Sequence, residues 1–414
     1  MNMVPEFQFL STNFYPGFKV TNMVLENNDK NRELFIYLSP LSEPCRCTCC
    51  GGMHISTHAV REKRIRDASF LGCQVTLVIT YRVIQCNDCG SYATEDIEFI
   101  SERARVTKRL EEEVIDDLEK SGSIKDTARR TGLGWDLCKD LHKRYLQENI
   151  SFELKDAKFL AIDEFSIKKG HKYATVVVDV ETRRVIWVGK GKAISDVNEF
   201  FRKCGTEGCK QIKAVAMDQN AGFASCVKKY CPQAKVIYDL FHMIYNYGRL
   251  VVSAIRLRLA SEHNGNGDEK PARVLKNSRF LLLTKLSGLS SERKVKLDEL
   301  LARYKDLNAA HLLKELLPDV FKADSKSESE KLWDKWVEIA MSSDVKEITS
   351  FAANQNRRYR DGITNSGLYK LRTSVLEGIN NKIKVLKRVA YGYRDTDYFF
   401  LRIQSAFRGR PAIN

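Results

Sequence analysis

The stretch from Lys158 to Gly191, KFLAIDEFSIKKGHKYATVVVDVETRRVIWVGKG, decides the fold class of this chain. It holds three apolar runs, KFLAIDEF, YATVVVDV and RVIWVGKG, which polar residues separate. Two more apolar runs follow, IKAVAMD at 212–218 and KVIYDLF at 235–241, with segments of helical spacing between them. Apolar strands interleaved with helices are typical of a layered α/β domain. We therefore predict a multidomain α/β protein with this domain at its centre.

The composition is that of an ordinary globular protein, with 43% hydrophobic and 29% charged residues among 414. This composition excludes a fibre or a largely disordered chain. The net charge of +15 predicts a negatively charged partner, and nucleic acid is the commonest one for a basic protein. No apolar run reaches the length of a membrane span, and the first residues do not resemble a signal peptide. We expect a cytoplasmic protein with no membrane partner.

The pattern changes along the chain at several points. Residues 101–150 and 246–355 have helical spacing, whereas the first 100 residues contain short strand-like runs. Trp333 and Trp336 have apolar neighbours at helical spacing, and we expect them in a core. We predict five regions: a strand-rich region at 1–100, three helices at 101–150, the first part of the α/β domain at 151–245, a helical insertion at 246–355, and the second part of the α/β domain with a basic tail at 356–414.

Three acidic residues are candidates for a metal site. Asp163 follows the apolar run FLAI and Asp218 follows AVAM, so each ends an apolar strand. Carboxylates at the ends of neighbouring strands would lie together at the sheet edge and would need a cation; Mg²⁺ or Mn²⁺ suits oxygen ligands. Glu377 opens the helical run EGINNKIKVLKR and is the third candidate. Taken singly, an Asp after a strand is as often a turn residue or a helix cap.

Six of the twelve cysteines fall in two groups, at 45–50 and 86–89. Two CxxCG sequences lie within these groups, and each places two thiols on one tight turn. Four such thiolates are the ligands of a tetrahedral zinc ion, so we predict a zinc ribbon rather than a small core of unpaired cysteines. Cys45 and Cys49 form another conceivable pair in the first group. The glycine that follows favours the set Cys47, Cys50, Cys86 and Cys89.

Residues 106–147 form three predicted helices. Ser123 is a candidate cap of the middle helix, with Asp126 at its third position, and Gly132 breaks the chain before the last helix. Two short helices joined by a glycine-containing turn are typical of a helix-turn-helix, whose second helix enters the major groove. Positive and negative charges balance over 101–150, so a plain three-helix linker stays an alternative. The candidate DNA contacts are Trp135, Asp136, Lys139, Lys143 and Arg144.

Three blocks of the sequence together resemble one protein family. They are IDEFSIKKGHKYATVVVDVETRRVIWVGKG at 162–191, MDQNAGFASCVKKYCPQAKVIYDLFHM at 217–243, and LEGINNKIKVLKRVAYGYRDTDYFFLRI at 376–403. They are similar to the catalytic blocks of bacterial insertion-sequence DDE transposases with an N-terminal zinc ribbon. The order of zinc ribbon, helix-turn-helix, split catalytic domain and basic tail also resembles this family, over nearly the whole chain.

The resemblance implies an RNase H-like catalytic domain with an all-helical insertion. It assigns the catalytic, Mg²⁺-binding triad to Asp163, Asp218 and Glu377. The sequence Asp239-Leu-Phe-His242 resembles the DxxH of the family, which adds His242 to the candidate catalytic residues. His242 either lies near the scissile phosphate or a flipped base, or supports a metal ligand. Asp239 is placed to bond its ring and fix its tautomer.

The implied function is DNA transposition. The protein would bind the terminal inverted repeats of its element, hydrolyse a strand at each end, and join the 3′-hydroxyl to target DNA, with two divalent ions. Joining two ends predicts at least a homodimer on DNA. The alternative function is that of a catalytically silent, domesticated DNA-binding repressor. Further candidate DNA contacts are basic residues suited to a phosphate backbone: Arg357, Arg358, Lys382, Lys384, Lys387 and Arg388. For Arg357 and Arg358 the alternative is a solvated, charged loop.

Overall fold

The computed structural model of the chain describes residues 5–28, 31–41, 46–102, 104–168, 170, 172–371 and 374–409. The chain forms two compact units. Unit 1 contains residues 1–151 and 385–401, and unit 2 contains residues 152–384 and 402–414. Across the described ranges, no helix has the length and apolar character that a membrane crossing requires.

Unit 1 begins with a five-stranded sheet of order β1-β2-β4-β3, in which β5 also pairs with β4. β2 and β4 are parallel, and the other neighbours are antiparallel. Alternate residues of β4 point into a core that also contains Tyr15, the residue after helix α1 (Pro5–Phe14). The strands confirm the strand-rich prediction, but α1 lies outside it. The strands are β1 (Phe18–Asn28), β2 (Asn31–Pro40), β3 (Ile55–Phe70), β4 (Cys73–Cys86) and β5 (Tyr92–Thr94).

Three helices complete the N-terminal part of unit 1, as the spacing predicts. Ser123 Oγ accepts a hydrogen bond from Asp126 N at 3.3 Å, so the predicted cap is present. Gly132 ends the middle helix at φ +67°, a conformation that glycine adopts without steric cost. The later segment 385–401 adds to their core, because buried Tyr398 places its hydroxyl 2.7 Å from Nδ1 of His142. The helices are α2 (Lys108–Ser121), α3 (Ile124–Thr131) and α4 (Trp135–Asn149).

Unit 2 is built on a second five-stranded sheet, of order β10-β9-β6-β7-β8. β7 pairs in antiparallel orientation with both β6 and β8, whereas β9 pairs in parallel with β6 and β10 pairs in parallel with β9. These are the five strands that the apolar runs predict. They are β6 (Phe159–Lys168), β7 (Lys172–Asp179), β8 (Val185–Lys190), β9 (Ala214–Met217) and β10 (Lys235–Tyr238).

Helices pack against this sheet and connect its strands. Helix α5 contacts β8 and α6, and its buried Phe200 and Phe201 join the large core of unit 2. Phe407, after the last helix, accepts a backbone hydrogen bond from Val185 of β8, which ties the end of the described chain to the sheet. The helices within unit 2 are α5 (Ile194–Gln211), α6 (Ala221–Tyr230) and α7 (Leu240–Tyr247). Two later helices, α15 (Ser374–Val389) and α16 (Thr396–Ala406), belong to unit 2 except for their residues within 385–401, which belong to unit 1.

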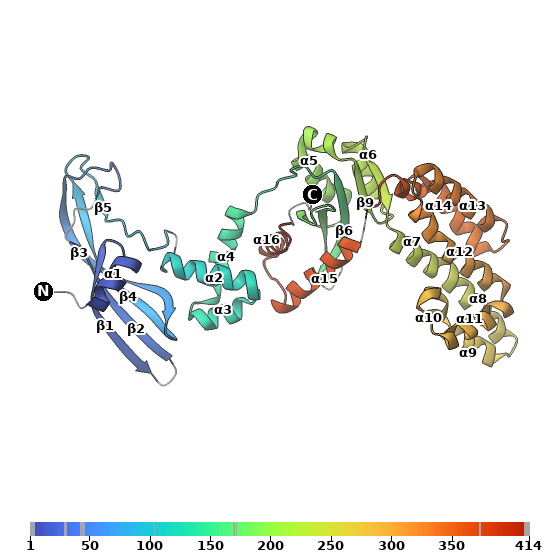
Figure 1. Cartoon of the computed structure of the whole chain (residues 1–414), viewed down its shortest axis with the longest axis horizontal. Helices are drawn as coiled ribbons and strands as arrows, with labels where there is room; N and C mark the ends of the chain where they lie inside the picture. The colour runs from blue at the N-terminus through green and yellow to red at the C-terminus, as the bar shows by residue number, and fades with distance from the viewer. Residues whose placement is uncertain are drawn as a thin grey trace. The chain divides into compact units, whose positions relative to one another are not determined.

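The remaining helices of unit 2 gather into a bundle (Figure 1). A π-helical turn, Gly248–Val252, joins α7 to the bundle, and α14 returns to contact β10. Trp333 stacks on Trp336 at 5.1 Å with both rings buried, which confirms their predicted core position. The predicted boundary at 355–356 falls inside α14. The bundle helices are α8 (Ser253–Gly265), α9 (Glu269–Asn277), α10 (Arg279–Leu283), α11 (Ser291–Arg303), α12 (Lys305–Lys322), α13 (Lys326–Met341) and α14 (Lys346–Thr364).

Candidate functional site

The sheet of unit 2 places two carboxylates side by side. Ile162 of β6 pairs with Met217 of β9, so the next residues, Asp163 and Asp218, occupy adjacent positions on parallel strands. This arrangement confirms that the two strands are neighbours. The prediction that Asp163 ends its strand is wrong, because β6 continues to Lys168 through its pairing with β7. Asp218 does follow the last residue of β9.

Opposing effects act on the pKa of the Asp163 carboxylate. Burial and the nearby charge of Asp218 raise the pKa of Asp163 to about 6. Two hydrogen bonds oppose this rise by stabilising the anion: Glu164 N donates to Oδ1 at 2.7 Å, and Asn380 Nδ2 donates to Oδ2 at 2.6 Å. Two carboxylates in one partly buried place favour a bound cation, and their oxygen atoms are the donors that Mg²⁺ and Mn²⁺ prefer.

A histidine joins this acidic pair from the start of α7. Asp239 caps α7 by accepting a hydrogen bond from Phe241 N at 2.8 Å. His242 Nδ1 lies 2.5 Å from Asp218 Oδ1 and 3.1 Å from Asp239 Oδ2, so the expected Asp239–His242 bond is present. These hydrogen bonds raise the pKa of His242 to about 10. Ligand atoms of Asp218, Asp239 and His242 all lie within 4.8 Å of one another, as a metal site requires.

Glu377, the third predicted carboxylate, lies in the first turn of α15 and is exposed. Asn380 is one turn further along the same helix, and its bond to Asp163 brings α15 to β6. In the described part of the chain, Asp163, Asp218 and Glu377 do not form a group as close as the one with Asp239 and His242. The helix that carries the glutamate is therefore at the site, while its carboxylate is turned to solvent.

Several amide and amine side chains that the sequence prediction omits support the site. Gln219, next to Asp218, forms a reciprocal amide pair with buried Gln355 of α14, with Nε2–Oε1 distances of 2.6 and 3.2 Å. Asn220 and Lys192 both contact the Glu164 carboxylate, at 3.2 and 3.1 Å. The pairs are distant in sequence, so no local pattern indicates them.

The second metal-binding group lies in unit 1, where two turns bring four thiols together. Cys47 Sγ is 3.8 Å from Cys89 Sγ, and Cys50 Sγ is 3.6 Å from Cys86 Sγ. Zinc–sulfur bonds of about 2.3 Å in a tetrahedron imply sulfur–sulfur distances of about 3.8 Å, so the thiol set fits zinc. Backbone N–H of Cys50 and the Ser91 hydroxyl lower the pKa of Cys47. Although the backbone N–H of Gly52 opposes it, hydrogen bonds with Cys89 and Cys86 raise the pKa of Cys50. Metal binding therefore requires that this thiol lose its proton.

The long hairpin of β3 and β4 connects the two turns of this cluster. Gly51 and Gly90, the glycines of the CxxCG sequences, have φ of +73° and +70°, so both turns use the conformation that the spacing predicts. Cys49 is exposed and only its backbone N–H approaches Cys47 Sγ, at 3.4 Å. Cys45 lies outside the described residues. The cluster confirms the four predicted ligands as one group.

Helix α4, the predicted recognition helix, has its lysines engaged within unit 1. Lys139 Nζ and Lys143 Nζ lie 3.3 and 2.8 Å from Asp395 Oδ2. Although burial opposes it, hydrogen bonds from these lysines lower the pKa of Asp395 to about 2. Trp135, in the first turn of α4, is 48% exposed, and Asp136 is exposed beside it. The start of α4 is thus open to solvent, while its two lysines are paired.

The other predicted basic residues lie on two helices of the second half of the chain. Arg357 and Arg358 are exposed on α14, which is a helix and not the loop of the alternative prediction. On α15, Ile379 and Ile383 are buried, and the basic residues occupy other positions of the helix. Of these, Lys382, Lys384 and Arg388 are exposed and Lys387 is half-buried.

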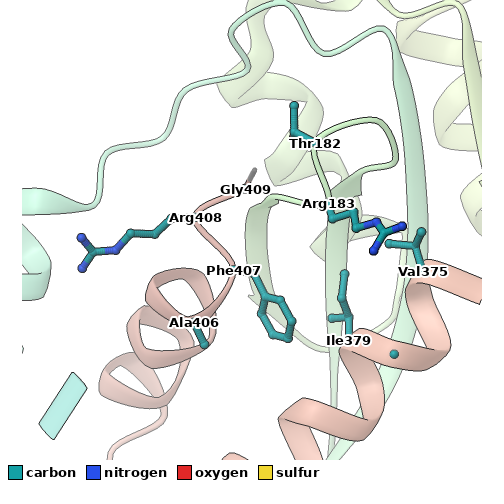
Figure 2. Close-up of a pocket in the computed structure, with 9 residues that line it drawn as sticks. Thr182, Arg183, Val375, Ile379, Ala406, Phe407, Arg408 and Gly409 are labelled. Carbon is teal, nitrogen blue, oxygen red and sulfur yellow. The ribbon is translucent and has the colours of Figure 1, made fainter. Parts of the chain in front are cut away.

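A cavity of about 510 Å³ lies elsewhere in unit 2, beside the turn between β7 and β8. Val375, Ile379 and Phe407 contribute apolar side chains, and Figure 2 shows the Arg183 guanidinium turned toward Val375 while that of Arg408 points away. This turn lies at the end of β6 where Leu160 pairs with Asp179, away from Asp218. The acidic site is therefore separate from this cavity.

Comparison with known proteins agrees with this geometry. Residues 160–403 match a family of DDE-type transposases, and residues 95–146 match the helix-turn-helix domain of transposase family ISL3. The protein is thus a transposase by its catalytic and DNA-binding regions. Over 92% of its length the chain is 35% identical to the transposase for insertion sequence element IS1001 of Bordetella parapertussis, of which it covers 93%. It belongs to the ISL3 family of DDE transposases, which confirms the resemblance.

A second relative is more distant. The chain is 28% identical to the transposase for insertion sequence element IS1557 of Mycobacterium tuberculosis. This match covers 57% of the chain and 56% of the relative.

The helix-turn-helix of the ISL3 family implies that the protein binds DNA, and the DDE domain implies divalent metal ions.

Proposed function

We propose that the protein binds the terminal inverted repeats of its own insertion sequence, cuts a strand at each end, and joins the new 3′-hydroxyl to target DNA. The observation that carries this proposal is the adjacent placement of Asp163 and Asp218 on β6 and β9, with α15 bonded to Asp163. The strand order of unit 2 supports an RNase H-like catalytic domain. The bundle α8–α14 is then its helical insertion.

Asp163, Asp218 and Glu377 are the residues that we assign to two Mg²⁺ or Mn²⁺ ions. Bound ions of this kind supply the Lewis acidity that activates a water or a 3′-hydroxyl and stabilises the leaving oxygen. Asn380 orients the Asp163 carboxylate through its hydrogen bond. Asp239 holds His242 against Asp218, so His242 positions that ligand or donates a proton near the scissile phosphate. Glu377 would join the pair through a different side-chain conformation, because its carboxylate is exposed in this structure.

DNA recognition is assigned to unit 1 and to the basic helices. The zinc ribbon, with Zn²⁺ at Cys47, Cys50, Cys86 and Cys89, and the helix-turn-helix read the ends of the element. Basic residues of α14 and α15 contact phosphates and make the affinity depend on salt. Joining two ends implies that at least two copies of the chain assemble on DNA. On α4, Arg144 adds a phosphate contact, and Lys139 and Lys143 add theirs to the extent that they leave Asp395.

The test is cleavage of a labelled duplex that carries the DNA flanking the gene, with Mg²⁺, with Mn²⁺, and with EDTA as control. We expect metal-dependent cuts at one defined position, and loss of cutting with retained binding in Glu377→Gln. Unchanged cutting in that variant would refute the role of Glu377. Binding without a cut in the wild-type protein, under every metal condition, would favour the alternative of a silent repressor.

A further inference from the structure

Helix α7 carries an exposed stripe that begins at the acidic site. Phe241 and Tyr245 lie four residues apart on α7, and residues at this spacing lie on one face of an α-helix. Arg249 follows just beyond α7, in the π-helical turn Gly248–Val252. Phe241 is 68% exposed and Tyr245 is 55% exposed, and Arg249 is exposed as well. Figure 1 shows α7 between the sheet of unit 2 and the helical bundle. We call these three residues the α7 stripe.

The first residue of the α7 stripe touches the candidate active site. The Phe241 ring packs edge-on against the His242 ring, with centroids 5.6 Å apart and an interplanar angle of 88°. His242 Nδ1 in turn lies 2.5 Å from Asp218 Oδ1. A phosphodiester bound at Asp218 would therefore have its neighbouring nucleotide within reach of the Phe241 ring.

The packing of α7 against unit 2 does not depend on these two exposed aromatic rings. The opposite face of α7 is anchored by Met243 and Tyr247, both fully buried in the core of unit 2. Within the described residues, no carboxylate pairs with Arg249. Two solvent-facing rings followed by a cation match a nucleotide, because bases stack on aromatic faces and phosphates bind guanidinium groups.

We propose that Phe241 and Tyr245 form a stacking platform for the base at the cleaved end of the element, and that Arg249 contacts a phosphate of the same strand. This inference rests on the proposed function and deepens it. Taking a base out of the stack costs free energy, and stacking on the platform offsets that cost. Stacking of one base is worth roughly 5- to 150-fold in affinity.

The first experiment measures cleavage by the full chain on two end duplexes, one normal and one with an abasic terminal nucleotide. We expect the Phe241→Ala/Tyr245→Ala double variant to cut the normal duplex roughly tenfold more slowly. On the abasic duplex the variant and the wild type should cut at equal rates, since no base is left to stack. Tyr245→Phe keeps a ring and should keep the wild-type rate. Phe280→Ala, which removes a ring 72% exposed on α10, is the matched control.

A second experiment needs no chemistry at the phosphate. With EDTA present, 5-iodouracil at the terminal position should cross-link to Phe241 or Tyr245 under ultraviolet light. Absence of this cross-link in the wild type would overturn the platform even if the protein cuts DNA. Failure of the wild type to cut, with the cross-link present, would refute the proposed function and leave the platform standing.

Other outcomes of the cleavage assay also decide against the platform. Equal slowing of the double variant on normal and abasic duplexes would assign the rings a structural role. Wild-type rates on both duplexes would show that stacking contributes nothing. Loss of self-association in light scattering, with normal cutting per assembled complex, would assign the α7 stripe to a second copy of the chain.

Discussion

Replacement of Asp163 by asparagine should stabilise the ion-free protein while abolishing cleavage. The carboxylate is held in a place that disfavours its charge, and the difference between a pKa of about 6 and the ordinary 3.8 corresponds to about 3 kcal/mol. Asparagine keeps the shape and loses the charge, but its single amide oxygen accepts only one of the two bonds, for example that from Glu164 N. Its NH2 group then faces Asn380, whose side-chain amide has to flip to accept a hydrogen bond instead of donating one. We therefore expect a net gain of about 1–2 kcal/mol in the free energy of unfolding of unit 2 at pH 7.5.

The pH dependence follows from the direction of this pKa. Because the folded protein holds the Asp163 proton more tightly than the unfolded chain, the cost of the charge grows as pH rises from about 4 to about 6. Above pH 6 the cost is constant, and near pH 4 it nearly vanishes. The advantage of Asp163→Asn should therefore be full at pH 7.5 and almost absent at pH 4.

Thermal unfolding followed by tryptophan fluorescence, with EDTA present, measures this effect. Three of the four tryptophans, Trp187, Trp333 and Trp336, lie in unit 2, so the signal reports mainly on the unit that contains Asp163. Added Mg²⁺ should stabilise the wild type and not the variant. A variant that is less stable than the wild type at pH 7.5, or a difference that does not shrink toward pH 4, would refute the reasoning.

Three further predictions concern other parts of the molecule. Cys50→Ser should lower the zinc content below one ion per chain and weaken end binding in mobility shifts; full zinc content would exclude this residue as a ligand. His242→Ala should destabilise the ion-free protein by about 1 kcal/mol at pH 6. This loss should disappear as pH rises through 10, because the raised pKa of His242 contributes stability only while the ring is protonated. Denaturant titrations measure the effect, and a loss that grows above pH 10 would contradict the prediction. Asp395→Asn should release Lys139 and Lys143 and steepen the salt dependence of DNA binding by about one to two phosphate contacts; an unchanged slope would place these lysines away from DNA.

Local sequence patterns predicted the parts of this molecule whose physics is local. The CxxCG turns depend on a glycine at positive φ, and the α3 cap depends on a serine three residues before the N–H it accepts from, so both follow from spacing alone. The two strands that lead to Asp163 and Asp218 follow from their apolar runs, whereas the pairing of β6 with β9 is known only from the structure. These features need only a few consecutive residues.

The features that prediction missed depend on residues distant in the chain. Asn380 bonds Asp163 across 217 positions, and Asp395 pairs with Lys143 across 252. Nothing in the period of α4 indicates that its lysines have an internal partner. The extension of β6 beyond Asp163 likewise depends on its pairing with β7. An acidic residue after an apolar run predicts the end of a strand as long as the neighbouring strand is unknown.

The passage of the chain between the two units has a consequence for protein synthesis. Unit 1 contains the first 151 residues and returns for 385–401, where Tyr398 binds the buried His142. During translation the helix-turn-helix therefore leaves the ribosome long before the residue that completes its core. A truncated product that ends before Tyr398 lacks this hydrogen bond and its ring packing, and it should recognise element ends less well than the finished chain. DNA binding by the helix-turn-helix should in this way be strongest in chains that carry nearly all of the catalytic region.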